Sequence, residues 1–356
     1  MKLKNNPQLI GTILVAAALI FAPLAFIGQD YVLRVLTTAA TFAIAVYGMN
    51  IILGLTGQLS LAHGGFFGIG VYTVGLLTTD YDWSFWASFF TAIALTAVIG
   101  FAAGVVALRT REEYFAIFTM AVGTIIFLVI SRWESVTHAH SGVNGVKFPE
   151  GVGPIDFSEP ILMYYLVLVF LAGSAYVTWA IKRSGVGRTL VAIRTSEDLA
   201  SSIGVNVGLN KQLAFAASTT FAGAAGGLYA AVQGFVGPSS ANINVTFEML
   251  MFILVGGLGT VLGPIVGTFI VTFLFEQFQD FQDYRFIVLG PVIIALVIFA
   301  PKGIVGYLNS MLAKRKHRPA ATRSTRPSAG STSPLSHESL PDADSVTQKE
   351  THDDPR

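Results

Sequence analysis

Long stretches without a charged residue recur along this chain from near its N-terminus to about residue 300. Two of them are LIGTILVAAALIFAPLAFIG at residues 9–28 and WSFWASFFTAIALTAVIGFAAGVVAL at residues 83–108. Each is long enough to cross ~30 Å of hydrocarbon as an α-helix, which takes about 20 residues. A membrane β-barrel would instead alternate apolar and polar residues. The sequence therefore predicts an all-α integral membrane protein, and its charged fraction of 12%, against about 25% in soluble domains, agrees with this.

We expect about ten transmembrane helices, some of them broken or re-entrant. The stretch from Glu248 to Glu276 is too long for one upright helix, and GGLGTVLGPIVG interrupts it. We divide it at Gly263-Pro264, because proline cannot donate a helical hydrogen bond and glycine loosens the turn. The predicted spans are 8–27, 31–53, 60–78, 84–108, 114–131, 160–181, 212–233, 247–262, 264–278 and 285–300.

The distribution of Lys and Arg predicts the orientation of these spans, since such residues gather on the cytoplasmic side. With a cytoplasmic N-terminus and an uncleaved first span, the outer side receives only Arg34, Arg132, Lys147 and Arg285. The inner side receives Lys2, Lys4, Arg109, Arg111, Lys182, Arg183, Arg188, Arg194, Lys211 and Lys302. An odd number of spans would place the basic cluster at 314–318 outside, so charge also supports the division at Gly263-Pro264.

Three segments outside the spans define the domain organisation. Residues 132–159 form an outer loop and residues 182–211 form the largest inner loop of a transmembrane domain, 1–312. Residues 313–356 are rich in Ser, Thr, Pro and charge without an apolar period, which predicts a disordered cytoplasmic tail. The chain has no Cys, which excludes disulfides and thiolate metal sites.

The motifs of the common catalytic and nucleotide-binding sites are missing from the sequence. There is no G-x-x-x-x-G-K-[ST], H-E-x-x-H or G-x-S-x-G string, and no paired intramembrane carboxylates. His138 and His140 are a candidate metal pair, but a solvated loop is the more frequent explanation. The net charge of +1 gives no indication of nucleic acid binding. We therefore predict no catalytic, cofactor or metal site, and a chain that is not an enzyme.

Glycine in this chain has two explanations. Pairs such as Gly64-x-x-x-Gly68 and Gly223-x-x-x-Gly227 favour close helix packing. In GLTGQLS at residues 54–60, however, polar residues lie between two apolar spans, and helices broken at membrane depth are tolerated where they line a cavity. We expect a translocation path or, alternatively, interhelical hydrogen bonding, and the candidate path residues are Thr56, Gln58, Ser60 and His63.

The inner loop contains RTSEDLASSIG, which predicts a two-turn helix. Thr195 is a suitable N-cap, and Gly204 suits the position just past the end. Leu199 and Ile203 are four residues apart and share one face. A helix this short is marginal alone in water, so it needs the protein's own inner face, the membrane surface or a partner to pack against.

Several stretches together resemble the branched-chain amino acid ABC transporter permeases, the class that contains the LivH and LivM subunits. The resemblance covers roughly residues 30–305 and includes GLTGQLSLAHGGFFGIGVYTVGLL, RSGVGRTLVAIRTSEDLASSIGVNV, AFAASTTFAGAAGGLYA and FEMLMFILVGGLGTVLGPIVG. LRTREEYFAIFTMAVG and the long outer loop look more like LivM than LivH. Leu199 stands where a small Ala is usual, and the tail lies outside the pattern.

The resemblance implies a permease subunit of an ATP-binding cassette importer in a bacterial or archaeal cytoplasmic membrane. Its implied partners are a LivH-like second permease, two cytoplasmic ATPase subunits that use the ATP, and an extracytoplasmic solute-binding protein. The residues implied to couple to the ATPase are Gly187, Arg188, Arg194, Glu197, Asp198, Leu199, Ala200, Ile203 and Gly204.

The implied solute is a branched-chain or related hydrophobic amino acid. Urea and short-amide permeases share the same signatures, so they stay an alternative. An ion-coupled secondary transporter is less favoured. It would need a charged coupling residue within the membrane, whereas the acidic residues of this chain cluster at the ends of the spans.

Overall fold

The computed structural model describes residues 7–26, 28–107, 112–151, 153, 156–277, 290, 303–307 and 311. All of them belong to one compact unit, Met1–Lys316. The predicted tail, 313–356, lies outside the described residues, as does the predicted span 285–300 apart from residue 290.

Helices dominate the described residues, and several are long and apolar. Four segments have the length and composition to cross a membrane, namely Asp30–Leu55, Phe85–Ala107, Tyr114–Arg132 and Pro160–Arg183. Shorter apolar helices cover Gly11–Ala25, Ile243–Gly256 and Gly263–Gln277. The predicted class, a multi-span helical membrane protein, is confirmed.

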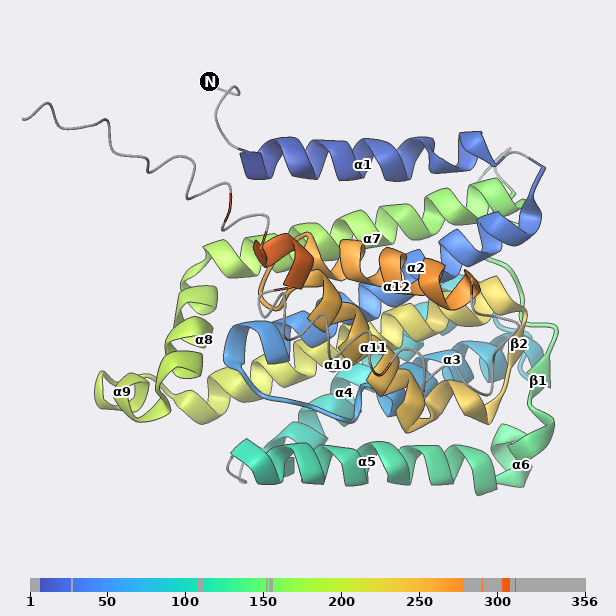
Figure 1. Cartoon of the computed structure of the whole chain (residues 1–356). Helices are drawn as coiled ribbons and strands as arrows, with labels where there is room; N and C mark the ends of the chain where they lie inside the picture. The colour runs from blue at the N-terminus through green and yellow to red at the C-terminus, as the bar shows by residue number, and fades with distance from the viewer. Residues whose placement is uncertain are drawn as a thin grey trace, which may run out of the picture. The chain divides into compact units, whose positions relative to one another are not determined.

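The described elements follow in chain order (Figure 1): α1 (Pro7–Ala25), α2 (Asp30–Met49), η2 (Asn50–Leu55), α3 (His63–Thr79), α4 (Phe85–Ala107), α5 (Glu112–Arg132), α6 (Glu134–Thr137), η3 (Ala139–Ser141), β1 (Val143–Asn144), α7 (Pro160–Arg183), α8 (Gly185–Thr195), α9 (Glu197–Ser202), α10 (Val207–Gln233), β2 (Phe235–Val236), η4 (Pro238–Ala241), α11 (Ile243–Gly256) and α12 (Gly263–Gln277).

Helix α10 forms the centre of the packing, in contact with α2, α3 and α4. Small residues make this possible: a Cβ at Gly70 of α3 would overlap the backbone of Gly223. A Cβ at Gly227 would come within 3.0 Å of the Phe89 ring and 3.1 Å of Val74. The packing interpretation of Gly223-x-x-x-Gly227 is therefore confirmed, since both glycines let neighbouring helices approach closely.

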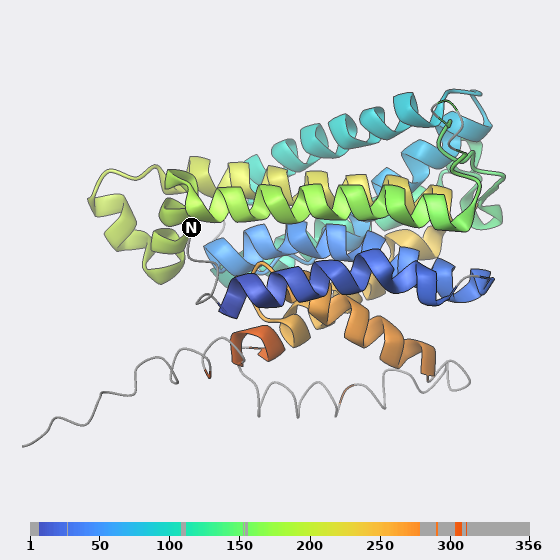
Figure 2. The same ribbon diagram turned by 90° about the horizontal axis from the view of Figure 1, so that it is seen from above.

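The two soluble loops lie at opposite ends of the long helices. Figures 1 and 2 show α8 and α9 at one end and the loop segments with β1 and β2 at the other. β1 and β2 pair antiparallel, with Val143 opposite Val236. Opposite ends are what the predicted inner loop, 182–211, and outer loop, 132–159, require.

Two ion pairs hold the outer loop against the turn between α3 and α4. His138 Nε2 lies 2.8 Å from an Asp80 carboxylate oxygen, and Lys147 Nζ lies 2.5 Å from Asp82. The hydrogen bond and charge of Lys147 lower the pKa of the Asp82 carboxyl below its ordinary value. His138 thus has a carboxylate partner, and within the described ranges no group of three or more His, Cys, Asp or Glu side chains is placed to hold a metal ion.

The stretch that we divided at Gly263-Pro264 is divided in the structure, at a different place. α11 ends at Gly256 and α12 begins at Gly263, so the break covers residues 257–262. α11 also begins at Ile243 rather than 247, because the Asn242 side chain accepts a hydrogen bond from the Asn244 N–H at 3.0 Å and caps the helix.

Candidate functional site

The second helix continues beyond Met49 in a wider form before it breaks. Asn50–Leu55 is a π-helix, a form found mostly as short insertions in α-helices and frequent at functional sites. Thr56 is the last helical residue, residues 57–62 are not helical, and α3 begins at His63. Gly57 has a φ of 79°, and a Cβ there would lie 2.9 Å from Arg194 Cγ, so the turn requires glycine. We call residues 57–62 the break; it confirms the predicted interruption.

The polar side chains of the break are buried. Gln58 is 5% exposed, and neither atom of its amide has a hydrogen-bond partner among the described residues. Ser60 is 1% exposed. Thr56 is also buried, but its hydroxyl donates to the Ile52 carbonyl of its own helix. A buried amide without partners costs about 1–3 kcal/mol, and the described residues leave the hydrogen-bonding capacity of the Gln58 amide unused.

His63, at the start of α3, bonds to a neighbouring helix. Its Nε2 atom lies 2.6 Å from the Ser218 hydroxyl of α10, and that hydroxyl donates to the Gly48 carbonyl at 2.6 Å. Since a serine hydroxyl has one proton, His63 donates through Nε2. Nδ1 has no hydrogen-bond partner among the described residues. Interhelical hydrogen bonding thus explains one nitrogen of His63, whereas no hydrogen bond within the described residues engages the side-chain amide of Gln58.

The loop between α11 and α12 is hydrogen-bonded to the end of α2 and to η2. The Asn50 Oδ1 atom accepts from the Gly259 N–H at 2.8 Å, and Asn50 Nδ2 donates to the Thr260 carbonyl at 2.9 Å. The Tyr47 hydroxyl donates to the Val261 carbonyl at 2.6 Å. Asn50 therefore ties η2 to the break between α11 and α12. The sequence analysis missed Asn50, although a single amide in the apolar run VYGMNIIL was an available signal.

The inner loop contains two helices, α8 and α9, where we expected one. Ser196, not Thr195, caps α9: its hydroxyl accepts from the Leu199 N–H at 3.3 Å. Thr195 ends α8 instead, and its hydroxyl donates to the Val191 carbonyl at 2.9 Å. Gly204 has a φ of 85°, as expected for the residue that ends the helix.

Some of the candidate coupling residues are exposed, and the others pack against or bond to their own chain. Leu199 and Ile203 are 64% and 71% exposed, whereas Ala200 of α9 is buried. Asp198 is exposed. The exposed pair gives α9 an apolar surface that nothing in the described chain covers.

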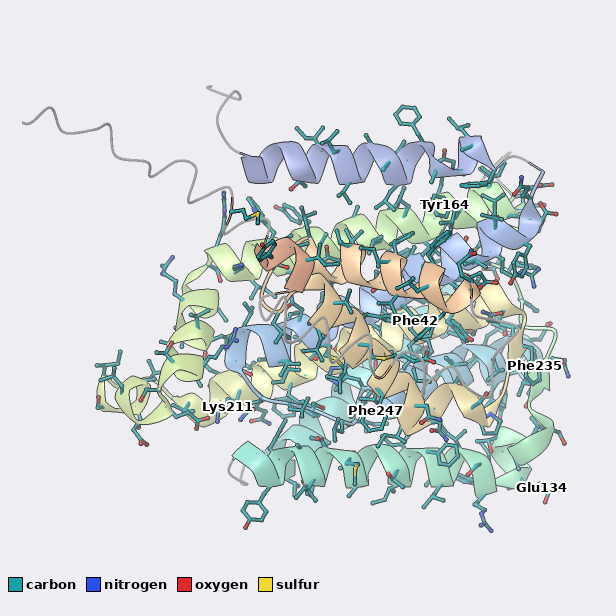
Figure 3. The ribbon with its side chains drawn as sticks, viewed as in Figure 1. Phe42, Glu134, Tyr164, Lys211, Phe235 and Phe247 are labelled. Carbon is teal, nitrogen blue, oxygen red and sulfur yellow. The ribbon has the colours of Figure 1, made fainter. Side chains whose placement is uncertain are left out.

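The charged residues expected beside that surface turn towards their own chain. Glu197 pairs with Lys211, which Figure 3 shows near the start of α10, beside α8 and α9. Arg194 Nη1 donates to the Gly54 carbonyl of η2 at 2.6 Å.

The first turn of α8 is likewise packed on α7. Arg188 donates to the Arg183 carbonyl at 3.3 Å. A Cβ at Gly187 would overlap the Ile181 carbonyl. The structure thus brings Arg194 to the residues just before the break, which the sequence did not predict.

Comparison with known proteins identifies the family of this chain. The family of branched-chain amino acid transport system permease components matches residues 31–297. The chain is 30% identical over 292 residues to the high-affinity branched-chain amino acid transport system permease protein LivM of Escherichia coli (strain K12), which covers 76% of this chain and 68% of LivM.

Two further relatives are more distant. The permease protein LivH of Salmonella typhimurium (strain LT2) is 26% identical over 290 residues, covering 76% of this chain and 92% of LivH. The autoinducer 2 import system permease protein LsrC of Yersinia pestis (strain Pestoides F) is 23% identical over 283 residues, covering 76% of this chain and 77% of LsrC. No solved structure matches.

The family match spans the helices from α2 to α12, including both breaks and the α8–α9 segment. The identity to LivM is higher than the identity to LivH, as the LRTREEYFAIFTMAVG stretch predicts. The chain belongs to the family of branched-chain amino acid transport system permease components and is LivM-like rather than LivH-like.

Proposed function

We propose that this chain is a permease subunit of an ATP-binding cassette importer for branched-chain amino acids, in the cytoplasmic membrane of a bacterium. Its partners are a second, LivH-like permease, two ATPase subunits and an extracytoplasmic solute-binding protein. The chain itself performs no covalent chemistry, and ATP hydrolysis belongs to the ATPase subunits. The names of LivM and LivH, both described as high-affinity branched-chain amino acid permeases, support the solute and the presence of a second permease.

The observation that carries the proposal is the amide of Gln58. It lies in a break between two spans, is 5% exposed and has no hydrogen-bond partner among the described residues. An amide offers both donors and an acceptor, so it suits a solute that carries an ammonium and a carboxylate. Binding at such a break, where backbone groups are also free of helical partners, is the arrangement that membrane transporters use. Gln58 and Ser60 would therefore face the solute during its passage.

The α9 surface supports the second half of the proposal. Leu199 and Ile203 expose large apolar side chains on a helix too short to be stable by itself. An ATPase subunit that covers them would provide the missing apolar contact. Gly204, just past this helix, fixes the direction in which the chain leaves it.

Reconstitution of the complete transporter in liposomes tests the proposal. We expect ATP-dependent uptake of leucine, isoleucine and valine when the solute-binding protein is present. Uptake of urea or acetamide in place of these amino acids would assign the alternative solute class. Uptake that proceeds without the ATPase subunits and collapses with an ionophore would contradict the importer assignment.

A further inference from the structure

We propose that Arg194 couples the α8–α9 segment mechanically to the break, as a positioning residue that acts through the Gly54 carbonyl. The inference rests on the proposed importer function. It assigns to Arg194 a role in transmitting movement, distinct from the docking role that the sequence suggested. Three sets of contacts carry it.

The first set joins α8 to the end of η2. Arg194 Nη1 donates to the Gly54 carbonyl at 2.6 Å. This carbonyl is among the last of the helix, where acceptors lack a backbone partner. The Arg194 stem also lies along the turn at Gly57, since a Cβ there would be 2.9 Å from Arg194 Cγ. One side chain of α8 therefore contacts both one of the last carbonyls of η2 and the first turn of the break.

The second set brings in the other break, residues 257–262. Lys182, at the end of α7, donates to the Gly259 carbonyl at 2.5 Å. Gly259 packs against the same point as Arg194, because a Cβ there would lie 3.1 Å from the Gly54 carbonyl oxygen and 3.6 Å from Arg194 Nη1. Asn50 of η2 also connects the two regions, through its two hydrogen bonds to Gly259 and Thr260. Hydrogen bonds from a charged donor are stronger than neutral ones, so the two cations hold the two breaks firmly.

The third set connects α8 to the exposed helix α9. Ser184 caps its start, accepting from the Gly187 N–H at 3.2 Å. α8 also contacts α9, whose Leu199 and Ile203 are exposed. A partner that moves α9 therefore moves α8, and α8 pulls on Gly54 through Arg194. Gln58 lies four residues beyond Gly54, so the pull reaches the polar part of the break directly.

The test uses the complete transporter with Arg194→Gln, Arg194→Lys and the matched control Arg183→Gln. Arg183 is a guanidinium at the end of α7, 4.5 Å from the centroid of the Trp179 ring, and among the described residues no side-chain hydrogen bond joins it to either break. We measure three quantities for each: co-purification of the ATPase subunits, ATP hydrolysis, and solute transported per ATP hydrolysed.

We expect Arg194→Gln to keep ATPase co-purification and hydrolysis while transport per ATP falls about tenfold, the size expected for losing a charge-assisted hydrogen bond. Arg194→Lys keeps the charge and a donor and should recover part of the ratio, and Arg183→Gln should equal the unaltered transporter. A normal ratio in Arg194→Gln overturns the proposal. Loss of ATPase co-purification in step with transport also overturns it, because Arg194 would then belong to the docking surface.

A second measurement is used if Arg194→Gln does not accumulate in the membrane. It also distinguishes failure of this inference from failure of the proposed function. The chain has no native Cys, so Gln58→Cys reports reagent access to the break. We expect ATP to change the reactivity of this Cys when Arg194 is present and to change it less in Arg194→Lys. An equal response in both overturns the inference, whereas the absence of ATP-driven uptake in the unaltered transporter contradicts the importer function itself.

Discussion

The Ser218 hydroxyl accepts a hydrogen bond from His63 Nε2 and donates one to the Gly48 carbonyl, each at 2.6 Å. This pair links the start of α3 to α10 and, through Gly48, to α2. All three groups are buried, where a donor without a partner is expensive. The link therefore fixes the end of the break at His63, whatever the break itself does.

We predict that Ser218→Ala lowers the thermal stability of the purified protein, because it leaves the buried Nε2–H of His63 without an acceptor. The expected loss is about 1–3 kcal/mol. Thermal unfolding in detergent measures it, with Ser174→Ala as the control. The Ser174 hydroxyl donates only to the Phe170 carbonyl of its own helix, at 2.8 Å, so its removal should matter less. Equal melting temperatures for the two variants would contradict the structural role of the pair.

Gln58→Leu is expected to lower uptake without lowering stability. The amide of Gln58 has no partner to lose, so an apolar side chain of similar volume should leave the melting temperature unchanged or raise it. Gln233→Leu is the contrast, since Gln233 donates to the Thr38 hydroxyl at 3.4 Å and its loss should destabilise the protein. Uptake kinetics together with thermal unfolding check both. Normal uptake in Gln58→Leu would return the residue to a packing role.

The features foreseen from the sequence depend on local pattern. Apolar runs of membrane-spanning length predicted the helices, and the glycines of GLTGQLS predicted the break before α3. The N-cap of α9 was wrong by one residue because Thr195 and Ser196 are both good caps. Here Thr195 bonds back to Val191, inside the preceding helix.

The contacts that could not be foreseen join residues far apart in the chain. Lys182 was counted only as a cytoplasmic charge, and Arg194 as a cytoplasmic charge and a candidate ATPase contact. In the structure, Lys182 donates to a carbonyl in the break between α11 and α12, and Arg194 donates to a carbonyl just before the break that precedes α3. Neither a charge count nor a helical period carries information about which backbone carbonyl lacks a partner. The position of Asn50 between η2 and the loop 257–262 depends on the same tertiary packing.

The orientation predicted from Lys and Arg has a direct test, because the chain has no native Cys. Ser141 and Ser201 are both exposed, at opposite ends of the helices. In intact cells, Ser141→Cys should react with a membrane-impermeant thiol reagent, and Ser201→Cys should react only after the inner membrane is opened. The reverse pattern would invert the proposed topology and place α8 and α9 on the wrong side for an ATPase.

The last prediction concerns the apolar surface of α9. Leu199→Asp should leave the stability of this chain unchanged, because the side chain is 64% exposed here. It should weaken co-purification of the ATPase about tenfold or more, since burying a leucine contributes about 1.5–3 kcal/mol, and uptake should fall with it.

The matched control for that variant is Val136→Asp, an apolar side chain that is 42% exposed, on α6 at the opposite end of the helices. It should keep ATPase binding. Gly204→Val should act like Leu199→Asp through geometry, because a β-branched residue resists a φ of 85°. Leu199→Asp is thus expected to lose the ATPase, whereas Arg194→Gln keeps the ATPase and loses transport. If Leu199→Asp retains full assembly and uptake, α9 is not the ATPase contact, and the displacement that Arg194 transmits must begin elsewhere.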